Sequence, residues 1–380
     1  MTKTTKSKLN KFKWLVTGAV ALNIALTGVS TADASSRSTK VAQEQNLSPQ
    51  AFYSTLTQSL KNFESEIEFN NFTKYGVTTT KLVEDHIEMA YYQTPLAIGL
   101  NSYGYSQKIM DNYSVGFKFN GEATKLKLKQ TKVLDEANKI VKSKITDKMT
   151  AEEKSRVIYD YLVQTVSYDD ALLKASLNGK ATYTDSFNAY GALINKKAVC
   201  QGFSGAFKIM ADLAGLENIV VTGHSKGIPH SWNKVKINNE WVNIDPTNNA
   251  NTMGIPYFLF MGSDDLAKSL GYKEDMLYAL DKDVKAGVYN TPKTTNDYYV
   301  KNKLIVSDVN QFKALMQSQL KENTNQMTFA YRLTNGVSAK TISFEARTQL
   351  EKARGTQFMN QHKLMYATLG NYVTLELVKK

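Results

Sequence analysis

Three residues that lie far apart in the sequence have the types needed for thiol chemistry. Cys200 is the chain's single cysteine, and His230 and Asp245 follow it. A thiol attacks a carbonyl carbon as the thiolate, so it needs a nearby base and a third group that orients that base. Apolar residues recur at helical spacing after Cys200 and predict a helix that begins there, where the helix dipole lowers a thiol pKa. The three residues are therefore a candidate nucleophile, base and orienting acid.

The spacing of His230 and Asp245 fits one face of a β-hairpin. Asn238-Asn239 predicts a two-residue turn between two strand patterns. With this turn, His230 faces Thr247, and Asp245 lies at the diagonal position on the same face. A slip of one residue would put the two side chains on opposite faces, so the spacing supports their meeting.

Each residue also has an ordinary structural interpretation. A lone cysteine beside an apolar helix is usually a small buried side chain. His224, in a predicted loop, is a competing base, and His230 can simply begin a strand. Asp245 precedes Pro246 and fits a turn residue. Trp232 suits the protein core as well as the wall of a site.

The composition excludes several classes of site. One cysteine excludes an internal disulfide framework, a zinc site with two or more cysteines and an iron–sulfur cluster. Four histidines leave little material for a histidine-rich metal site. The sequence has neither an EF-hand loop nor a glycine-rich phosphate motif. We therefore expect no cofactor.

The first residues have the pattern of a secretory signal peptide. Residues 1–13 contain five lysines and no acidic residue, an apolar stretch covers 14–29, and Ala32-Asp33-Ala34 supplies a cleavage site. The apolar stretch is short for a membrane span and is diluted by polar residues and glycines. We expect residues 1–34 to be removed, the mature protein to be secreted, and no integral membrane association to remain.

The charge balance bears on the partners. The 47 basic residues exceed the 35 acidic ones by 12, and loss of five lysines and one aspartate with the signal peptide lowers the net charge from +12 to +8. This charge favours adsorption to an anionic cell envelope. It is too diffuse and too poor in arginine for nucleic-acid binding. The expected partners are protein or peptide substrates and cell-envelope components.

Two terminal segments share one pattern. A helix pattern near 48–61 and the strand patterns after it return 260 residues later, so that Phe312 and Phe329 match Phe52 and Phe69. We interpret this as two similar small α+β modules, the second a repeat of the first; coincidental amphipathic patterning is the alternative. The predicted modules, 45–120 and 303–380, flank a central unit at 133–289.

The residues around the three candidates resemble a known family. Cys200 lies in VCQGF, His230 begins HSWN, and Asp245 lies in WVNIDPT; Tyr168-Asp169 and Ala189-Tyr190-Gly191 match as well. These motifs resemble the transglutaminase-like superfamily, and most closely its bacterial secreted branch and the cytokinesis-protein and kyphoscoliosis-peptidase-like groups. The resemblance covers less than half of the chain. It implies an α+β papain-like core, in which the helix that bears the cysteine packs on an antiparallel sheet.

The resemblance also implies an activity. A Cys-His-Asp triad of Cys200, His230 and Asp245 would transfer acyl groups from protein or peptide carboxamides, as in Gln–Lys crosslinking or amine transfer, at a bacterial cell surface. The Cys200 backbone N–H is one expected oxyanion donor, and Tyr190 is a candidate second donor or equally a core aromatic. The sequence leaves two alternatives open: a cysteine peptidase or amide hydrolase with the same triad, and a non-catalytic cell-envelope binding protein.

Overall fold

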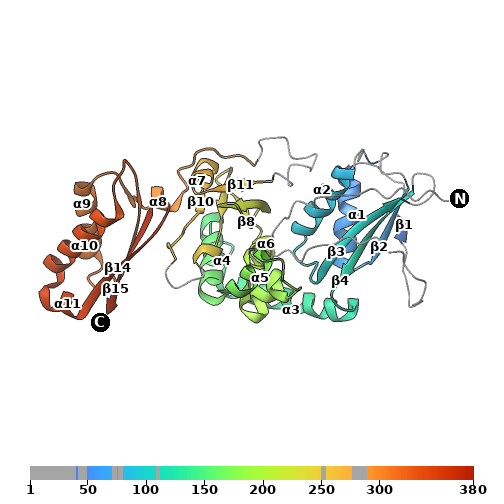
Figure 1. Ribbon diagram of the computed structural model, residues 1–380, viewed down its shortest axis with the longest axis horizontal. Helices are drawn as coiled ribbons and strands as arrows, with labels where there is room; N and C mark the ends of the chain where they lie inside the picture. Colours follow the sequence, from blue (N-terminus) through green and yellow to red (C-terminus); the bar gives the residue numbers. More distant parts are fainter. Residues whose placement is uncertain are drawn as a thin grey trace.

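The computed structural model describes residues 40–41, 49–70, 75, 80–107, 112–249, 254–275 and 289–380. The predicted signal peptide, 1–34, lies outside these residues. Three groups of elements follow one another along the long axis of the molecule (Figure 1). Among the described helices, none is both long enough and apolar enough to cross a membrane.

The central group is built around one apolar helix and one antiparallel sheet. Helix α6 (Cys200–Leu213) packs against a five-stranded sheet of order β10-β9-β8-β7-β11, in which every neighbouring pair is antiparallel. This confirms the α+β class and the expected helix on an antiparallel sheet. The strands are β7 (Asn218–Ser225), β8 (Ile228–Ile237), β9 (Glu240–Ile244), β10 (Phe260–Gly262) and β11 (Tyr272–Glu274).

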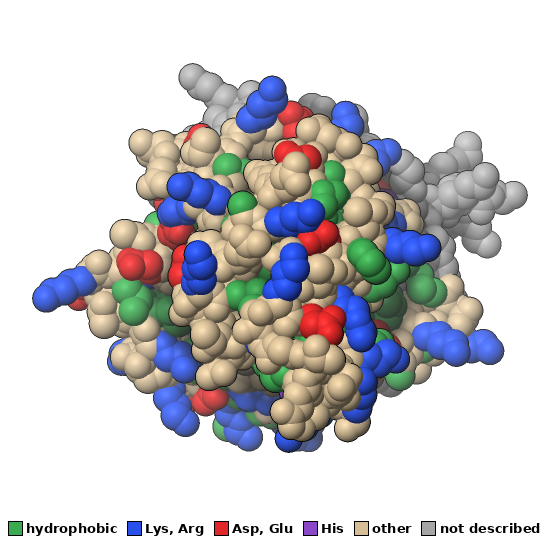
Figure 2. All heavy atoms as spheres, turned by 90° about the vertical axis from the view of Figure 1, so that its left-hand side faces the viewer, with side chains coloured by type: hydrophobic (Ala, Val, Ile, Leu, Met, Phe, Trp, Pro, Cys, Tyr) green, Lys and Arg blue, Asp and Glu red, His purple; other side chains and the backbone are tan. Residues whose placement is uncertain are grey.

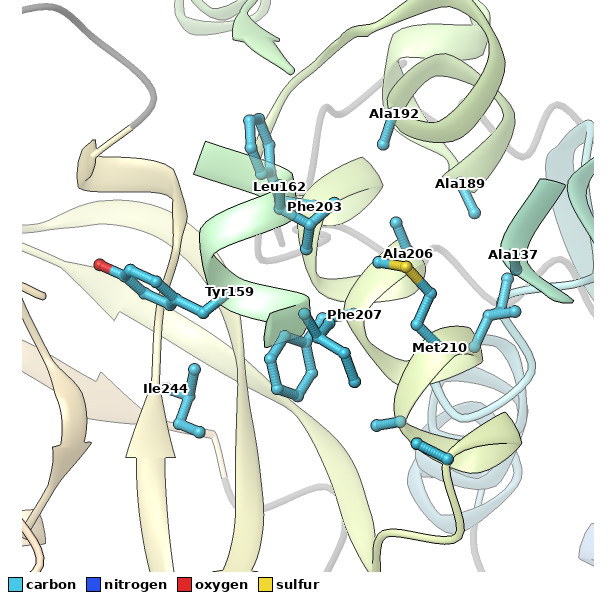
Figure 3. Packing of buried hydrophobic residues seen from close by; sticks show 14 of the residues in the cluster. Ala137, Tyr159, Leu162, Ala189, Ala192, Phe203, Ala206, Phe207, Met210 and Ile244 are labelled. Carbon is cyan, nitrogen blue, oxygen red and sulfur yellow. The ribbon is translucent and has the colours of Figure 1, made fainter. Parts of the chain in front are cut away.

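Helix α6 is buried because other helices cover it. Its Phe203 and Phe207 are fully buried, and Figure 3 shows them beside Tyr159 and Leu162 of α4 and Ile244 of β9. A continuous apolar core can thereby fix the position of the residue at the helix start. The surrounding elements are α3 (Ala123–Lys144), α4 (Ala151–Thr165), β5 (Ser167–Tyr168), α5 (Asp170–Leu177), β6 (Lys197–Ala198), α7 (Asp264–Ser269) and α8 (Tyr298–Lys301), with 3₁₀ turns at Asp185–Phe187 and Thr247–Asn249 and a π-helical turn at Gly191–Asn195.

The local signals in this group correspond to the structure. Asn238 and Asn239 have φ angles of 49° and 65°, as a tight hairpin turn with two left-handed residues requires. The side chain of Thr150 accepts a hydrogen bond from the Glu153 N–H, and the Glu153 carboxylate accepts one from the Thr150 N–H, which forms the capping box of α4. The predicted turn is therefore confirmed.

The terminal groups have the same strand order. The N-terminal sheet has the order β1-β2-β4-β3 and the C-terminal sheet the order β12-β13-β15-β14; in each, the first pair is parallel. Phe52 on α1 and Phe312 on α9 are both fully buried. The module boundaries remain predictions. The elements are α1 (Pro49–Asn62), α2 (Thr80–Tyr92), β1 (Lys40–Val41), β2 (Glu66–Asn70), β3 (Leu100–Gln107), β4 (Asn112–Phe119), α9 (Val309–Glu322), α10 (Ala339–Arg354), α11 (Thr356–Gln361), β12 (Ile305–Val306), β13 (Thr328–Leu333), β14 (His362–Leu369) and β15 (Tyr372–Lys379).

A buried ion pair connects the C-terminal sheet to the central group. The Arg332 Nη1 atom on β13 lies 3.0 Å from the Asp297 Oδ2 atom, and Asp297 caps α8. We expect Arg332→Met to lower the free energy of unfolding by about 3–5 kcal/mol, because it leaves the Asp297 carboxylate buried without its partner. Urea denaturation measures this loss.

The exposed pair between Lys125 and Glu122, 3.4 Å apart, provides the control for this prediction. We expect Lys125→Met to cost less than about 1 kcal/mol, because water screens the pair. Equal losses in the two variants would show that the buried pair does not stabilise the docking of the C-terminal sheet.

Candidate active site

Cys200 is the first residue of α6 and is 3% exposed. Its side chain lies beside the His230 ring and the backbone N–H of Ser231, and both act on the thiol. The thiol therefore lies between the start of α6 and strand β8. This is the position, at a helix N-terminus, that the sequence pattern predicts for it.

His230 and Asp245 are in direct contact. The His230 Nε2 atom lies 2.8 Å from the Asp245 Oδ2 atom and 3.4 Å from the Thr247 Oγ1 atom. Because Nε2 faces the carboxylate, Nδ1 is the ring nitrogen left for the thiol of Cys200. The structure thus brings all three candidates together in the order thiol, imidazole and carboxylate. Their catalytic role remains a prediction.

Asp245 is held by hydrogen bonds on both of its oxygens. Oδ1 accepts hydrogen bonds from the N–H and the hydroxyl of Thr247, at 3.0 and 2.6 Å. Oδ2 accepts them from the Tyr272 hydroxyl at 2.6 Å and the Asn248 amide at 3.0 Å. Burial opposes ionisation, but the charge and hydrogen bond of His230, together with these donors, lower the pKa of Asp245. The carboxylate therefore stays ionised and fixed in orientation.

Two aromatic side chains fix the His230 ring. Trp232, fully buried, stacks on it with centroids 6.1 Å apart and an interplanar angle of 21°, and Tyr272 meets it edge-on at 5.7 Å. The Trp232 indole N–H donates to the Asn243 Oδ1 atom at 2.9 Å. Trp232 is therefore both a core residue and a wall of the site.

The electrostatics favour an ion pair between the thiol and the imidazole. Burial acts against the charged thiolate, but the charge and hydrogen bond of His230 and the Ser231 N–H lower the pKa of Cys200. Burial likewise acts against imidazolium, yet the charges of Asp245 and Cys200 raise the pKa of His230 to about 10. At neutral pH we therefore expect a thiolate beside an imidazolium, the reactive state of a thiol nucleophile.

Close backbone approach holds the start of α6 in place. A Cβ atom on Gly202 would lie 2.9 Å from the carbonyl oxygens of Ser186 and Asn188 and 2.7 Å from the Ala198 Cβ. We expect Gly202→Ala to displace the helix start, to lower the free energy of unfolding by about 1–3 kcal/mol and to slow alkylation of Cys200. Thermal unfolding and iodoacetamide labelling measure these two effects.

Gly104 is the matched control, because a Cβ atom there meets no atom within 4 Å. Gly104→Ala should leave the labelling rate of Cys200 unchanged. A Gly202→Ala variant that behaved like Gly104→Ala would contradict this account of how α6 is held.

Other candidates from the sequence lie elsewhere. His224 lies opposite Pro229 in the β7–β8 pair, with its Nδ1 atom 3.9 Å from the Asp275 Oδ1 atom, and His230 is the histidine at the thiol. The ring of Tyr190 lies under the Lys129 ammonium, 4.9 Å from it. The described contacts of Tyr190 thus lead to α3 rather than to Cys200, which argues against Tyr190 as an oxyanion donor.

The sequence patterns do not identify several residues of the site. Asn248 follows Asp245 by three residues, and the turn chemistry of Asp-Pro-Thr-Asn could have indicated it. Tyr272 lies on β11, which pairs with β7 at the edge of the sheet. The sequence around Tyr272 carries no pattern that predicts its hydrogen bond to Asp245. Ser231 contributes a backbone N–H, for which the side-chain pattern carries no signal.

A small pocket lies beside the same end of α6. The Gln201 amide on its wall donates a hydrogen bond to the Tyr91 hydroxyl of α2 at 2.8 Å. The N-terminal group therefore forms part of the surface next to the candidate nucleophile. The cavity is lined by Tyr91, Tyr92, Pro95, Ala97, Phe187, Asn188, Ala189, Gln201, Ser204, Gly205 and Val220.

No cluster of three or more side chains suited to a metal occurs in the described part of the chain. The three groups at the site are those of acyl transfer through a thiol: a nucleophile, a base and a carboxylate that orients the base. The remaining requirement is a set of donors for the oxyanion.

Part of this chain is similar in sequence to known proteins. Residues 138–246 match the model of the transglutaminase-like superfamily. The human kyphoscoliosis peptidase is 25% identical over an alignment of 122 residues, and the match covers 29% of this chain and 18% of that protein. This chain therefore corresponds to less than a fifth of the length of the human protein.

Two solved structures are similar in part. A crystal structure of a TGase has 15% sequence identity and a TM-score of 0.28, with 55% of this chain and 58% of that chain covered. A candidate cysteine protease from Cytophaga hutchinsonii has 12% identity and a TM-score of 0.25, with 48% and 69% covered. The matched residues 138–246, which include Cys200 at the start of α6, are similar to the transglutaminase-like superfamily.

Proposed function

We propose that the protein is a secreted cysteine enzyme that transfers acyl groups from protein or peptide carboxamides to amines. The observation that carries this proposal is the continuous contact from the Cys200 thiol through the His230 ring to the Asp245 carboxylate. A structural cysteine needs neither a lowered pKa nor a histidine fixed by a buried carboxylate.

The reaction follows from the ionisation states. The Cys200 thiolate attacks the carboxamide carbon and forms a C–S bond, while the C=O electron pair moves onto oxygen. When that pair returns, the C–N bond breaks and the His230 imidazolium gives its proton to the departing ammonia. A primary amine then attacks the thioester, His230 takes the proton of the amine, and the thiolate is released. Asp245 keeps the imidazole oriented throughout.

Hydrolysis is the second candidate function. The similarity to a human protein named as a peptidase favours it. In this case water replaces the amine in the second step, and the same three residues act. A purely binding role is the third reading, and it predicts an unreactive Cys200.

One experiment separates these candidates. The mature protein is incubated with a glutamine-rich protein and a fluorescent primary amine, and Cys200→Ala is the control. Incorporation of the amine that the Cys200→Ala variant lacks supports acyl transfer to amines. Release of ammonia or of new amino termini without incorporation would assign hydrolysis instead. If neither product exceeds that of Cys200→Ala, the enzymatic proposal fails.

We further propose that the enzyme acts at the cell surface, where the residual positive charge holds it. Figure 2 shows lysine and arginine side chains spread over the face formed by the C-terminal group, with fewer acidic side chains between them. Retention on isolated cell envelopes that is lost at high salt would support this, since salt screens such attraction. Retention that salt does not change would contradict it. Exposed basic residues of this group include Lys303, Lys321, Lys340, Arg347, Lys352 and Lys363.

A further inference from the structure

The carboxylate oxygen that faces His230 also receives two other donors. Asp245 Oδ2 lies 2.8 Å from the His230 Nε2 atom and 2.6 Å from the Tyr272 hydroxyl. The Asn248 amide donates to the same oxygen at 3.0 Å. An oxygen of a carboxylate has two lone-pair sites, so three donors share the electron density of Oδ2. The shortest of the three contacts is the one from Tyr272.

The fold fixes the Tyr272 hydroxyl at this oxygen. Strand β11 pairs with β7, with Tyr272 opposite Ser225, and its ring meets the Trp232 ring edge-on with centroids 5.1 Å apart. The Asn248 amide donates to the Tyr272 hydroxyl at 2.8 Å, so the hydrogen of the phenol is left for Asp245. Burial raises the pKa of Tyr272 well above its ordinary value, and the phenol therefore keeps this hydrogen.

A donor to the carboxylate weakens the carboxylate as a partner of imidazolium. Burial opposes the ionisation of Asp245, whereas its donors, Tyr272 among them, lower its pKa. A less basic carboxylate holds a neighbouring cation less strongly. Burial lowers the pKa of His230, and the charge of Asp245 is the largest influence that raises it, to about 10. Tyr272 thus acts against the raised basicity of His230.

We propose that Tyr272 is a positioning residue that limits how strongly Asp245 stabilises the His230 imidazolium, so that His230 can still release the proton on Nδ1. This inference rests on the proposed function. In the carboxamide reaction the C–S bond forms, the C–N bond breaks, and the imidazolium proton leaves with ammonia. A more stable imidazolium would retain this proton, because a general acid works best when its pKa lies near the operating pH.

Further titratable side chains surround the pair of imidazolium and carboxylate. Cys200 supplies the thiolate, whose charge acts together with that of Asp245 to raise the pKa of His230. Tyr159 of α4 and Tyr168 of β5 feel the charge of Asp245, and burial raises the pKa of each well above its ordinary value. Both phenols are therefore uncharged at neutral pH.

The first measurement is the titration of the His230 ring by NMR, with isotope-labelled histidine and with the signals assigned by their loss in His230→Gln. In Tyr272→Phe we expect a higher titration midpoint than in the wild type, because Asp245 Oδ2 loses its shortest donor. Asn248→Ala removes a longer hydrogen bond from the same oxygen and should raise the midpoint by a smaller amount.

The second measurement compares two acyl donors. Nitrophenolate leaves p-nitrophenyl acetate as an anion and needs no proton, whereas ammonia leaves a glutamine carboxamide with the proton of His230. We expect Tyr272→Phe to release ammonia roughly 3- to 10-fold more slowly, since proton donation follows acid strength, and to keep the ester burst at its wild-type rate. Tyr299→Phe is the matched control, because this hydroxyl, in the same apolar cluster, donates to the Pro256 carbonyl. It should change neither rate nor the midpoint.

The possible outcomes separate the inference from the proposed function. A midpoint in Tyr272→Phe that is equal to or below the wild-type midpoint would overturn the inference. Equal slowing of the two acyl donors would overturn it as well, since this indicates a misplaced triad rather than a weaker acid. A wild-type protein that the ester acylates but that releases no ammonia contradicts the proposed carboxamide donor, and the titration then decides the role of Tyr272 alone.

Discussion

Replacing Cys200 by alanine is expected to lower acyl transfer by roughly 10⁴- to 10⁶-fold, because the variant has no atom that can form the covalent intermediate. Cys200 is the chain's single cysteine, so no second thiol can replace it. Amine incorporation into a glutamine-rich protein measures the loss.

The fold should survive this substitution. His230 keeps its carboxylate partner, and the truncated side chain is small, so we expect thermal unfolding close to that of the wild type. Cys200→Ser is the companion variant: it keeps the shape of the side chain but carries a hydroxyl that His230 cannot ionise to a useful extent. Activity in either variant above about one per cent of wild type would rule out Cys200 as the nucleophile.

Asp245→Asn is expected to lower kcat/KM by roughly 10²- to 10⁴-fold while the shape of the side chain is retained. Burial lowers the pKa of His230, and the charge of Asp245 is the largest influence that raises it, to about 10. Without that charge, imidazolium loses its proton at lower pH. In the wild type the rate should fall at alkaline pH, near pH 10, as His230 loses its proton. We therefore expect this fall to occur at a lower pH in the variant.

The control for this prediction is Asp212→Asn, at a carboxylate that is 52% exposed and lies on the far end of α6. It should leave both the rate and the alkaline limb unchanged. An unshifted limb in Asp245→Asn would show that the carboxylate does not set the charge of His230.

The contact between His230 and Asp245 could be predicted because it depends on local geometry. Once Asn238-Asn239 forms the turn, the two-residue period of a strand decides which side chains share a face. The position of Cys200 follows in the same way from the helical spacing after it and is confirmed at the start of α6. Both predictions need only the order of residues within one helix or one hairpin.

The rest of the site depends on contacts between elements that are distant in the sequence. Tyr272 reaches Asp245 because β11 joins the sheet beside β7, and Tyr168 stacks on Phe203 of α6 because β5 pairs with β6. Neither strand is long enough to show a pattern of its own. Helix α3 is likewise hard to predict. Its lysine-rich sequence has a mean hydropathy typical of an exposed segment, yet its Val133 and Ala137 side chains are fully buried.

The choice of Tyr190 as an oxyanion donor shows the same limitation. Tyr168 and Tyr190 both lie in segments that match the family motifs, and the sequence has no means of ranking them. Their three-dimensional neighbours separate them: Lys129 for Tyr190, and Phe203 of α6 for Tyr168.

The central claim, that His230 and Asp245 activate Cys200, is tested most directly by the pH dependence of Cys200 alkylation. Iodoacetamide labelling of the mature protein is followed by mass spectrometry from acid to alkaline pH. We predict fast labelling that is already near its maximum at neutral pH, since the pKa of Cys200 is lowered by its pairing with His230. A rate that rises about tenfold per pH unit up to the range of an ordinary thiol, near pH 8.5, would contradict the account.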